Sequence, residues 1–189
     1  MRKIVLSLHT TLDGFVAGPN GEMDWIKLDD GIFDLVATFT QKADTVLYGR
    51  VTYQMMNSYW PTAAEKSNAS KHDIEHSTWY NMVDKVVLSR TIKGNDDMKT
   101  RFISRNIFNE INDFRNQPGK DILMFGSPTA AHSLMEYNLI DEYWLFVNPI
   151  IFGQGIPLFA NIKERINLER LTTKLFSCGV TALNYSVVK

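Results

Sequence analysis

The chain has 189 residues, and its 20 basic and 21 acidic side chains give a formal net charge of −1. Hydrophobic residues make up 44% of the chain, which is typical of a globular protein with its own buried core. No block of like charge favours nucleic acid or an anionic membrane surface as a partner. The single cysteine excludes an internal disulfide, and no apolar run is long enough to span a bilayer. We therefore expect one cytoplasmic domain over residues 1–189.

The first half of the chain alternates predicted strands and helices. Residues 3–9 form a partly alternating apolar run that predicts a strand. Residues 11–27 are rich in Gly, Asp, Asn and Pro, which indicates a long ordered loop of the kind that is often functional. The helical spacing of Ile32, Leu35 and Phe39 predicts a helix over 31–42. The pattern then predicts a strand at 44–48, a helix at 52–59, a polar surface stretch at 60–72 and a strand at 83–88.

The second half repeats this order and ends differently. Residues 91–104 show no clear pattern. The next predicted elements are a helix at 106–116, a strand at 121–125, a helix at 129–137 and a strand at 142–147. Residues 168–175 and 180–188 are typical of an antiparallel pair that meets across a Ser-Cys-Gly turn. The order predicts an α/β fold with a mostly parallel sheet, helices on both faces and an antiparallel C-terminal hairpin.

Residues suited to phosphate binding follow three of the predicted strands. Ligands of open α/β sheets bind beyond the carboxyl ends of the strands, where helix N-termini donate N–H groups to phosphate. Glycine permits close approach of the backbone, and arginine with a hydroxyl grips a phosphate. These residues are Gly49, Arg50, Thr52, Leu88, Ser89, Arg90, Gly126, Ser127 and Thr129. Taken alone, such a glycine is more often part of a turn and such an arginine is more often a solvated charge, whereas the shared edge of the sheet favours one ligand site. Neither G-x-G-x-x-G nor a Walker loop is present.

An ordered set of motifs carries a resemblance to a known superfamily. Thr11-Leu12-Asp13-Gly14, Gly49-Arg50-Val51-Thr52-Tyr53, Leu88-Ser89-Arg90 and Phe125-Gly126-Ser127 together resemble dihydrofolate reductases. The run Asn148-Pro149-Ile-Ile-Phe-Gly153-Gln-Gly155 more specifically resembles the reductase domain of the riboflavin-pathway deaminase/reductase and its single-domain relatives. The resemblance spans nearly the whole chain and implies a dihydrofolate reductase-like three-layer sandwich.

The resemblance also implies a cofactor, a reaction and an oligomeric state. It implies NADPH, with Arg50, Ser89 and Arg90 around the adenosine phosphate, and a homodimer. The residues it implies along the pyrophosphate are Gly49, Thr52, Gly126, Ser127 and Thr129, with the 11–27 loop closing over the nicotinamide. The implied reaction is hydride transfer to a heterocyclic substrate of the 5-amino-6-(5-phosphoribosylamino)uracil type in riboflavin biosynthesis. The alternatives are a non-catalytic NADPH- or nucleotide-binding module and a true dihydrofolate reductase.

Some features depart from this family pattern. The H-x-E and P-C-x-x-C zinc ligands of the deaminase domain are absent, so this chain alone cannot deaminate. His72 and His76 have helical spacing without a third ligand, and we therefore expect no metal. The chain has Gly126-Ser127-Pro128 in place of the double glycine of the family, and the proline removes one possible N–H donor.

The proton donor and the substrate contacts are the least determined residues. Asp34 falls on the position of the carboxylate that dihydrofolate reductase carries on its first helix. Among apolar side chains such a carboxylate would have a raised pKa and act as an acid, whereas on the solvated flank of the helix it would have no such role. Asp13, Trp25 and Gly153 are candidate substrate contacts, although Asp13 also suits the turn before Gly14.

Overall fold

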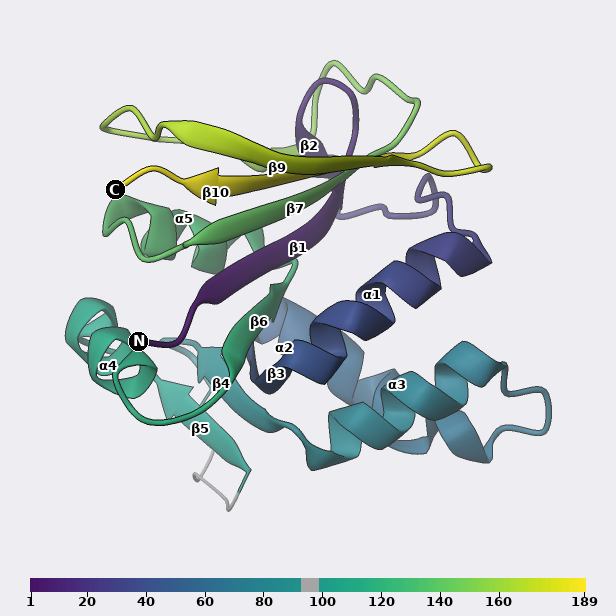
Figure 1. The fold of residues 1–189 in the computed structure, drawn as a ribbon, viewed down its shortest axis with the longest axis horizontal. Helices are drawn as coiled ribbons and strands as arrows, with labels where there is room; N and C mark the ends of the chain where they lie inside the picture. The colour runs from purple at the N-terminus through teal and green to yellow at the C-terminus, as the bar shows by residue number, and fades with distance from the viewer. Residues whose placement is uncertain (93–98) are drawn as a thin grey trace.

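The computed structural model describes residues 1–92 and 99–189. Its main sheet contains the strands β1 (Ile4–Thr10), β3 (Ala43–Gly49), β4 (Asp84–Leu88), β5 (Thr100–Ile103), β6 (Asp121–Phe125), β7 (Glu142–Val147), β9 (Leu168–Leu175) and β10 (Thr181–Val187). These eight strands lie in the order β5-β4-β3-β6-β1-β7-β10-β9 (Figure 1). The sheet is the middle layer of the molecule.

The sheet is parallel except at its C-terminal edge. β1 pairs in parallel with both β6 and β7, and β3 pairs in parallel with β4 and β6. β10 is antiparallel to β7 and to β9. Since helices cover both faces of the parallel part, nearly every residue of β1 is buried, including the polar residues Ser7 and Thr10. The predicted mixed α/β fold is confirmed.

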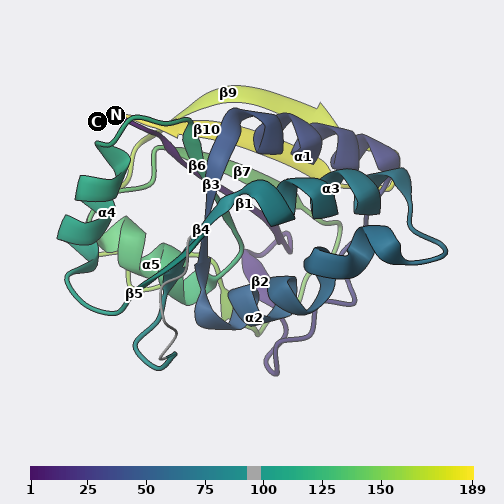
Figure 2. The same ribbon diagram turned by 90° about the horizontal axis from the view of Figure 1, so that it is seen from below.

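Helices cover the sheet on both sides. They are α1 (Asp30–Lys42), α2 (Arg50–Tyr59), the 3₁₀ helix η1 (Trp60–Glu65), α3 (Lys71–Met82), α4 (Ile107–Arg115) and α5 (Pro128–Glu136). Figure 2 shows α1 and α3 on one side of the sheet and α4 and α5 on the other. The described residues form three buried clusters, one around Ile32 and Phe39 of α1, one around Ala131 and Leu134 of α5, and one that includes Tyr48 of β3 and Tyr80 of α3.

Helix α1 confirms the prediction for residues 31–42. Asp29 caps it, because its side chain accepts a hydrogen bond from the backbone N–H of Ile32 at 3.0 Å. Lys42 lies in the last turn, where a cation is favourable beside the carbonyl end of the helix. Ile32 and Phe39 are buried against the sheet, so the apolar spacing marks the packed face.

The segment 60–72, predicted as a polar surface stretch, lies mostly at the surface but contains η1 at 60–65 and the start of α3 at 71–82, a helix that was not predicted. Helix α3 begins with a capping box formed by Ser70 and Asp73. Its buried residues are His76, Ser77 and Tyr80, which an apolar pattern does not detect. The hydrophobic spacing of this segment therefore does not predict a helix.

The segment 11–27, predicted as a loop, contains a short strand. This strand, β2 (Phe15–Ala17), pairs with β8 (Ile156–Pro157) to form a second, two-stranded sheet. The pairing brings the first loop against the Gly-Gln-Gly segment, which lies more than 130 positions further along the chain. In the described part of the chain, no helix is long and apolar enough to cross a membrane.

A buried ion pair joins the end of α4 to the start of β7. Arg115 is 2% exposed and pairs with the carboxylate of Asp141. Its guanidinium also donates to the carbonyl oxygens of Arg2 at 3.3 Å and Leu139 at 3.2 Å. Asp141 in turn accepts from the backbone N–H of Ile4 at 2.9 Å. These contacts of Arg115 and Asp141 hold together the start of β1, the end of α4 and the residues that precede β7.

We expect Arg115→Met to lower the free energy of unfolding by about 3 kcal/mol, because it breaks the buried pair and leaves Asp141 with only the partly exposed Lys189 as a cationic partner. Urea denaturation monitored by circular dichroism measures this. The matched control is Arg101→Met, which breaks a pair with Glu110 whose side chains are 44% and 40% exposed. That change should cost less than about 1 kcal/mol. Equal losses in the two variants would contradict this interpretation.

Candidate cofactor and substrate site

The carboxyl ends of the central strands meet at one rim of the sheet. The backbone N–H of Gly49, at the end of β3, donates to the side-chain oxygen of Ser127 at 2.8 Å. Gly49 is also the register partner of Leu88 at the end of β4. The N–H of Gly126, directly after β6, donates to the carbonyl of Ser7 in β1 at 3.3 Å. Four strands therefore contribute to the same rim, which we call the strand-end rim (residues 49–52, 88–90 and 126–129).

Close packing at this rim requires a glycine at position 49. A side-chain carbon placed there would lie 3.0 Å from the oxygen of Ser127 and 3.3 Å from the methyl group of Ala130. Both distances are tighter than ordinary van der Waals contact. The absent side chain lets the start of α2 approach the start of α5, so both helices begin at the same carboxyl-end edge of the sheet although they pack on opposite faces of it.

Both helix N-termini at the rim lack a side-chain cap. The N-cap residues are Gly49 for α2 and Ser127 for α5, and neither makes a side-chain capping hydrogen bond. First-turn N–H groups without a cap are donors for a phosphate, and the helix dipole favours the negative charge. A side-chain carbon at Gly126 would point toward Thr52, at 3.8 Å from its hydroxyl oxygen. The donor set of the rim therefore fits a pyrophosphate.

The remaining predicted cofactor residues differ in their surroundings. Leu88 is 7% exposed and packs in the core, so only its backbone faces the rim. Ser89 is 9% exposed, and its oxygen accepts from the N–H groups of Thr91 and Ile92 at 3.2 and 3.0 Å. Its hydroxyl thus stabilises its own turn. Arg50 and Arg90 are exposed at the starts of the segments that follow β3 and β4, and Thr129 is exposed in the first turn of α5.

The three predicted substrate residues come together beside the first loop. The carboxylate of Asp13 accepts from the N–H groups of Gly153 at 2.7 Å and Phe152 at 3.2 Å. The hydroxyl of Thr11 donates to the same carboxylate at 2.6 Å. Trp25 is half-buried and packs edge-on against the ring of Phe152 at 5.4 Å. Asp13 therefore joins two loops and has its oxygens engaged by backbone donors.

The hydrogen bonds to Asp13 also affect its ionisation. The Thr11 hydroxyl, followed by the N–H groups of Gly153 and Phe152, outweighs partial burial and lowers the pKa of this carboxyl group. Asp13 is thus held as a carboxylate, which suits a clamp between loops and does not suit a proton donor.

Asn148 holds the end of the first loop through its side chain, a role that its place at the start of the Asn148-Pro149 motif does not by itself predict. It follows β7 directly and is 1% exposed. Its side-chain oxygen accepts from the backbone N–H of Lys27 at 2.8 Å, and its nitrogen donates to the carbonyl of Phe146 at 3.0 Å. The feature of the sequence that could have indicated this role is the position of Asn148 directly after the predicted strand at 142–147.

Asp34 does not lie in the environment that an acid would need. It is exposed on α1, whereas Ile32 and Phe39 of the same helix are buried. The apolar setting that a proton donor would need is therefore missing, and the position of Asp34 on the solvated flank removes the basis for that assignment.

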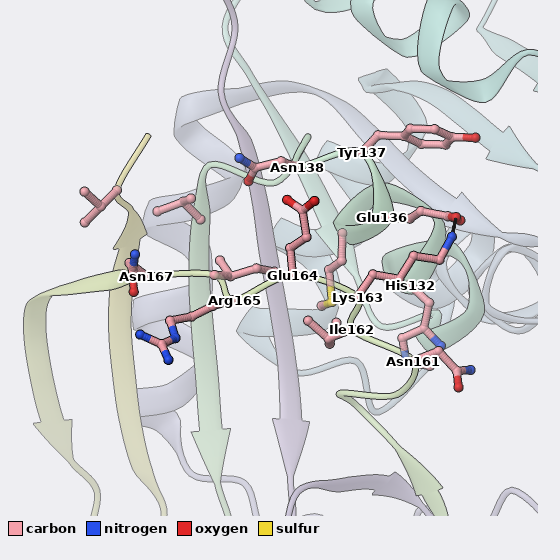
Figure 3. A pocket seen from close by; sticks show the side chains of 14 residues that line it. His132, Glu136, Tyr137, Asn138, Asn161, Ile162, Lys163, Glu164, Arg165 and Asn167 are labelled. Atoms are coloured by element: carbon pink, nitrogen blue, oxygen red, sulfur yellow. Dashed lines mark hydrogen bonds and ion pairs between the residues drawn. The ribbon is translucent and has the colours of Figure 1, made fainter.

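A pocket of about 330 Å³ lies elsewhere, at the end of the molecule opposite the rim (Figure 3). It is formed by the C-terminal end of α5, the segment 161–167 and the end of β10. Figure 3 shows Glu164, Arg165 and Asn138 around it, and Lys163 pairs with Glu136 at its edge. Val187 at its border bonds to Asp141, which precedes β7, so the pocket belongs to the amino-terminal side of the strands. None of the predicted site residues lines it.

The layers, the strand order and the rim define an α/β fold of the dihydrofolate reductase type. A dihydrofolate reductase from Enterococcus faecalis, solved with NADP(H), superposes with a TM-score of 0.64 over 99% of this chain and 97% of its own, at 13% identity. A putative riboflavin biosynthesis protein from Shewanella sp. PV-4 superposes with a TM-score of 0.71 over 99% of both chains, at 19% identity.

The chain belongs to the RibD C-terminal domain family, whose model matches residues 2–182. The protein YyaP of Bacillus subtilis is 37% identical over 188 residues, which cover 97% of this chain and 94% of YyaP. The resemblance stated from the sequence motifs is thereby confirmed at the level of family and fold.

We expect Ser127→Ala to lower the free energy of unfolding by about 1–3 kcal/mol, because the buried N–H of Gly49 then has no acceptor. Chemical denaturation measures the loss. Ser58→Ala is the control, since that hydroxyl is exposed and bonds only to the carbonyl of Met55 within its own helix. A Ser127→Ala protein as stable as the control variant would contradict the role of this hydrogen bond.

Replacing Asp13 by Ala should release the Gly-Gln-Gly segment from the first loop, because two backbone N–H groups lose their acceptor. We expect amide hydrogen exchange at 152–153 to become at least about tenfold faster, as a lost hydrogen bond of about 1.4 kcal/mol would produce. Asp24→Ala, an exposed carboxylate of the same loop, is the control. Unchanged exchange at 152–153 would show that Asp13 does not hold these loops together.

Proposed function

We propose that this protein is an NADPH-dependent oxidoreductase that delivers hydride to a heterocyclic substrate. The observation that carries the proposal is the strand-end rim, where Gly49, Gly126 and Ser127 bring two uncapped helix N-termini to the same carboxyl-end edge of the sheet. Family membership supports a reductase role, because the matching family is that of the riboflavin-type reductase domain.

The residues of the chain would bind and orient the cofactor, and NADPH supplies the hydride when bound. The first turns of α2 and α5, with Thr52 and Thr129, would hold the pyrophosphate through N–H groups and hydroxyls. Arg50 and Arg90, both exposed beside the rim, would pair with the adenosine phosphate. With a net charge of −1, the protein has no general positive field that would attract the phosphates of the cofactor. The residues at the rim must therefore bind these phosphates through individual contacts.

The proposed substrate class is a ribosylaminopyrimidine of the 5-amino-6-(5-phosphoribosylamino)uracil type. A pyrimidine reductase-like protein from Corynebacterium diphtheriae and the dihydrofolate reductase share the fold about equally, with TM-scores of 0.66 and 0.64, so the match to the RibD C-terminal domain family is what supports this class over a pterin. The first loop, closed by Asp13 and Asn148, would border the substrate with Trp25 and Gly153. Exclusion of water there would favour hydride transfer between rings in contact.

We further propose that the protein works in the cytoplasm as a homodimer. All eight residues of the edge strand β9 are exposed, including Leu171 at 51% and Leu175 at 77%. An exposed edge strand with apolar side chains is a surface that proteins normally cover.

We expect NADPH, followed by its nicotinamide fluorescence, to bind at micromolar concentrations and NADH to bind at least about tenfold more weakly, because only NADPH carries the 2′-phosphate. Arg90→Ala should weaken NADPH by about tenfold and leave NADH unchanged. Arg165→Ala, which lies at the opposite pocket, is the control. No binding at high micromolar NADPH would refute the proposed function. Binding without turnover of any pyrimidine or pterin would instead favour a non-catalytic module.

Light scattering on a size-exclusion column tests the dimer. We expect a mass of two 21.6 kDa chains and a shift toward one chain in Leu171→Glu, since a buried carboxylate in the contact costs binding energy. A wild-type protein that stays monomeric at high micromolar concentration would refute the dimer.

A further inference from the structure

His9 lies at the end of β1, beside the strand-end rim and on the face of the sheet that α1 covers. It is the register partner of Phe146 in β7, and the two rings stack with centroids 4.9 Å apart. Ser7, two residues earlier, accepts the N–H of Gly126. Two residues of strand span roughly 6–7 Å, about the breadth of one aromatic ring, so His9 stands one ring width beyond the Gly126 turn.

The surroundings of Asn148 fix the orientation of its amide group. Its side-chain oxygen faces the backbone N–H of Lys27 at 2.8 Å, which can only donate. Its nitrogen faces the carbonyl oxygens of Phe146 at 3.0 Å and Thr10 at 3.4 Å, which can only accept. A flipped amide would place like groups against each other on both sides, so the observed orientation is the one that these partners allow.

This orientation determines which nitrogen of His9 carries the proton. The nitrogen of Asn148 lies 3.1 Å from Nδ1 of His9. An amide nitrogen donates and does not accept, so Nδ1 must present its lone pair and the proton must reside on Nε2. No hydrogen bond to Nε2 exists among the described residues, which leaves its N–H as an unpaired donor.

The ring is also held in its neutral form. Burial lowers the pKa of His9 to about 4, because the surrounding protein solvates the imidazolium poorly. A neutral imidazole with its proton on Nε2 donates one hydrogen bond and keeps that proton at physiological pH.

We propose that His9 is a substrate-contacting residue whose Nε2–H donates a hydrogen bond to a carbonyl oxygen or ring nitrogen of a cyclic amide substrate, and that Asn148 is the positioning residue that sets its tautomer. This inference rests on the proposed function, since it assigns a residue to the same site. A fixed neutral donor at the substrate polarises the bond system that accepts the hydride, without a carboxylate at Asp34.

The tautomer is measured in the free protein, so the result does not depend on any substrate. Long-range ¹H–¹⁵N spectra of protein labelled at its imidazole nitrogens report each ring, and the His9→Gln spectrum identifies the signals of His9. We expect Nε2 protonated and Nδ1 unprotonated from pH 6 to pH 8. A proton on Nδ1, or an imidazolium at pH 7, would overturn the inference while leaving NADPH binding as a separate question.

Contact with substrate is tested on the NADP⁺-loaded protein with three probes: uracil, lumazine and 7,8-dihydropterin. At least one should shift the Nε2–H signal of His9, and His9→Phe should bind that probe about tenfold more weakly, because Phe keeps the ring stacking and removes the donor. His9→Gln, which restores an N–H donor, should recover part of the loss. NADPH affinity should stay within about twofold in both variants.

Two outcomes would refute the contact. If NADPH binds and none of the probes shifts the His9 signal, the donor does not meet a cyclic amide and the inference fails while the cofactor site stands. If His9→Phe binds the responding probe as tightly as the wild type, the nitrogen makes no contribution. Absence of NADPH binding refutes the proposed function instead. The tautomer measurement then still tests whether Asn148 sets the position of the proton on His9.

Discussion

The parallel register of β1, β3, β4 and β6 is the constraint on which the rest of the structure depends. Parallel strands place their carboxyl ends on one edge, so Gly49, Leu88 and Gly126 become neighbours although they are distant in sequence. The hydrogen bond from Gly49 to Ser127 locks two of these ends together at 2.8 Å. The helices that follow then start from a common rim with their N–H groups available.

Two polar side chains extend this rim into a site with a cover. Asp13 joins the first loop to the Gly-Gln-Gly segment, and Asn148 joins the end of that loop to β7 and β1. Each uses a side chain to satisfy backbone groups that no strand or helix serves, which keeps an otherwise irregular segment ordered. The side chain of Asn148 also contacts Nδ1 of His9, so the same residue positions the loop and sets which nitrogen of His9 is the donor.

Much of this architecture could be predicted from the sequence because it depends on local apolar patterns. The strands at 44–48, 121–125 and 142–147 and the helix at 31–42 carry strong spacing, and each was found close to its observed bounds. Helix α3 was missed because its buried face consists of His76, Ser77 and Tyr80. The pairing of β2 with β8 is short and joins segments far apart in sequence, so no local pattern reveals it. The clamp at Asp13 and the exposure of Asp34 depend on tertiary packing in the same way.

Hydrogen exchange with and without NADP⁺ tests most directly whether the three strand ends form one cofactor site. We expect saturating NADP⁺ to slow exchange together at 49–52, 88–90 and 126–129, because one extended ligand covers all three segments. Protection of only one of these segments, or protection at 161–167 beside the opposite pocket, would contradict it.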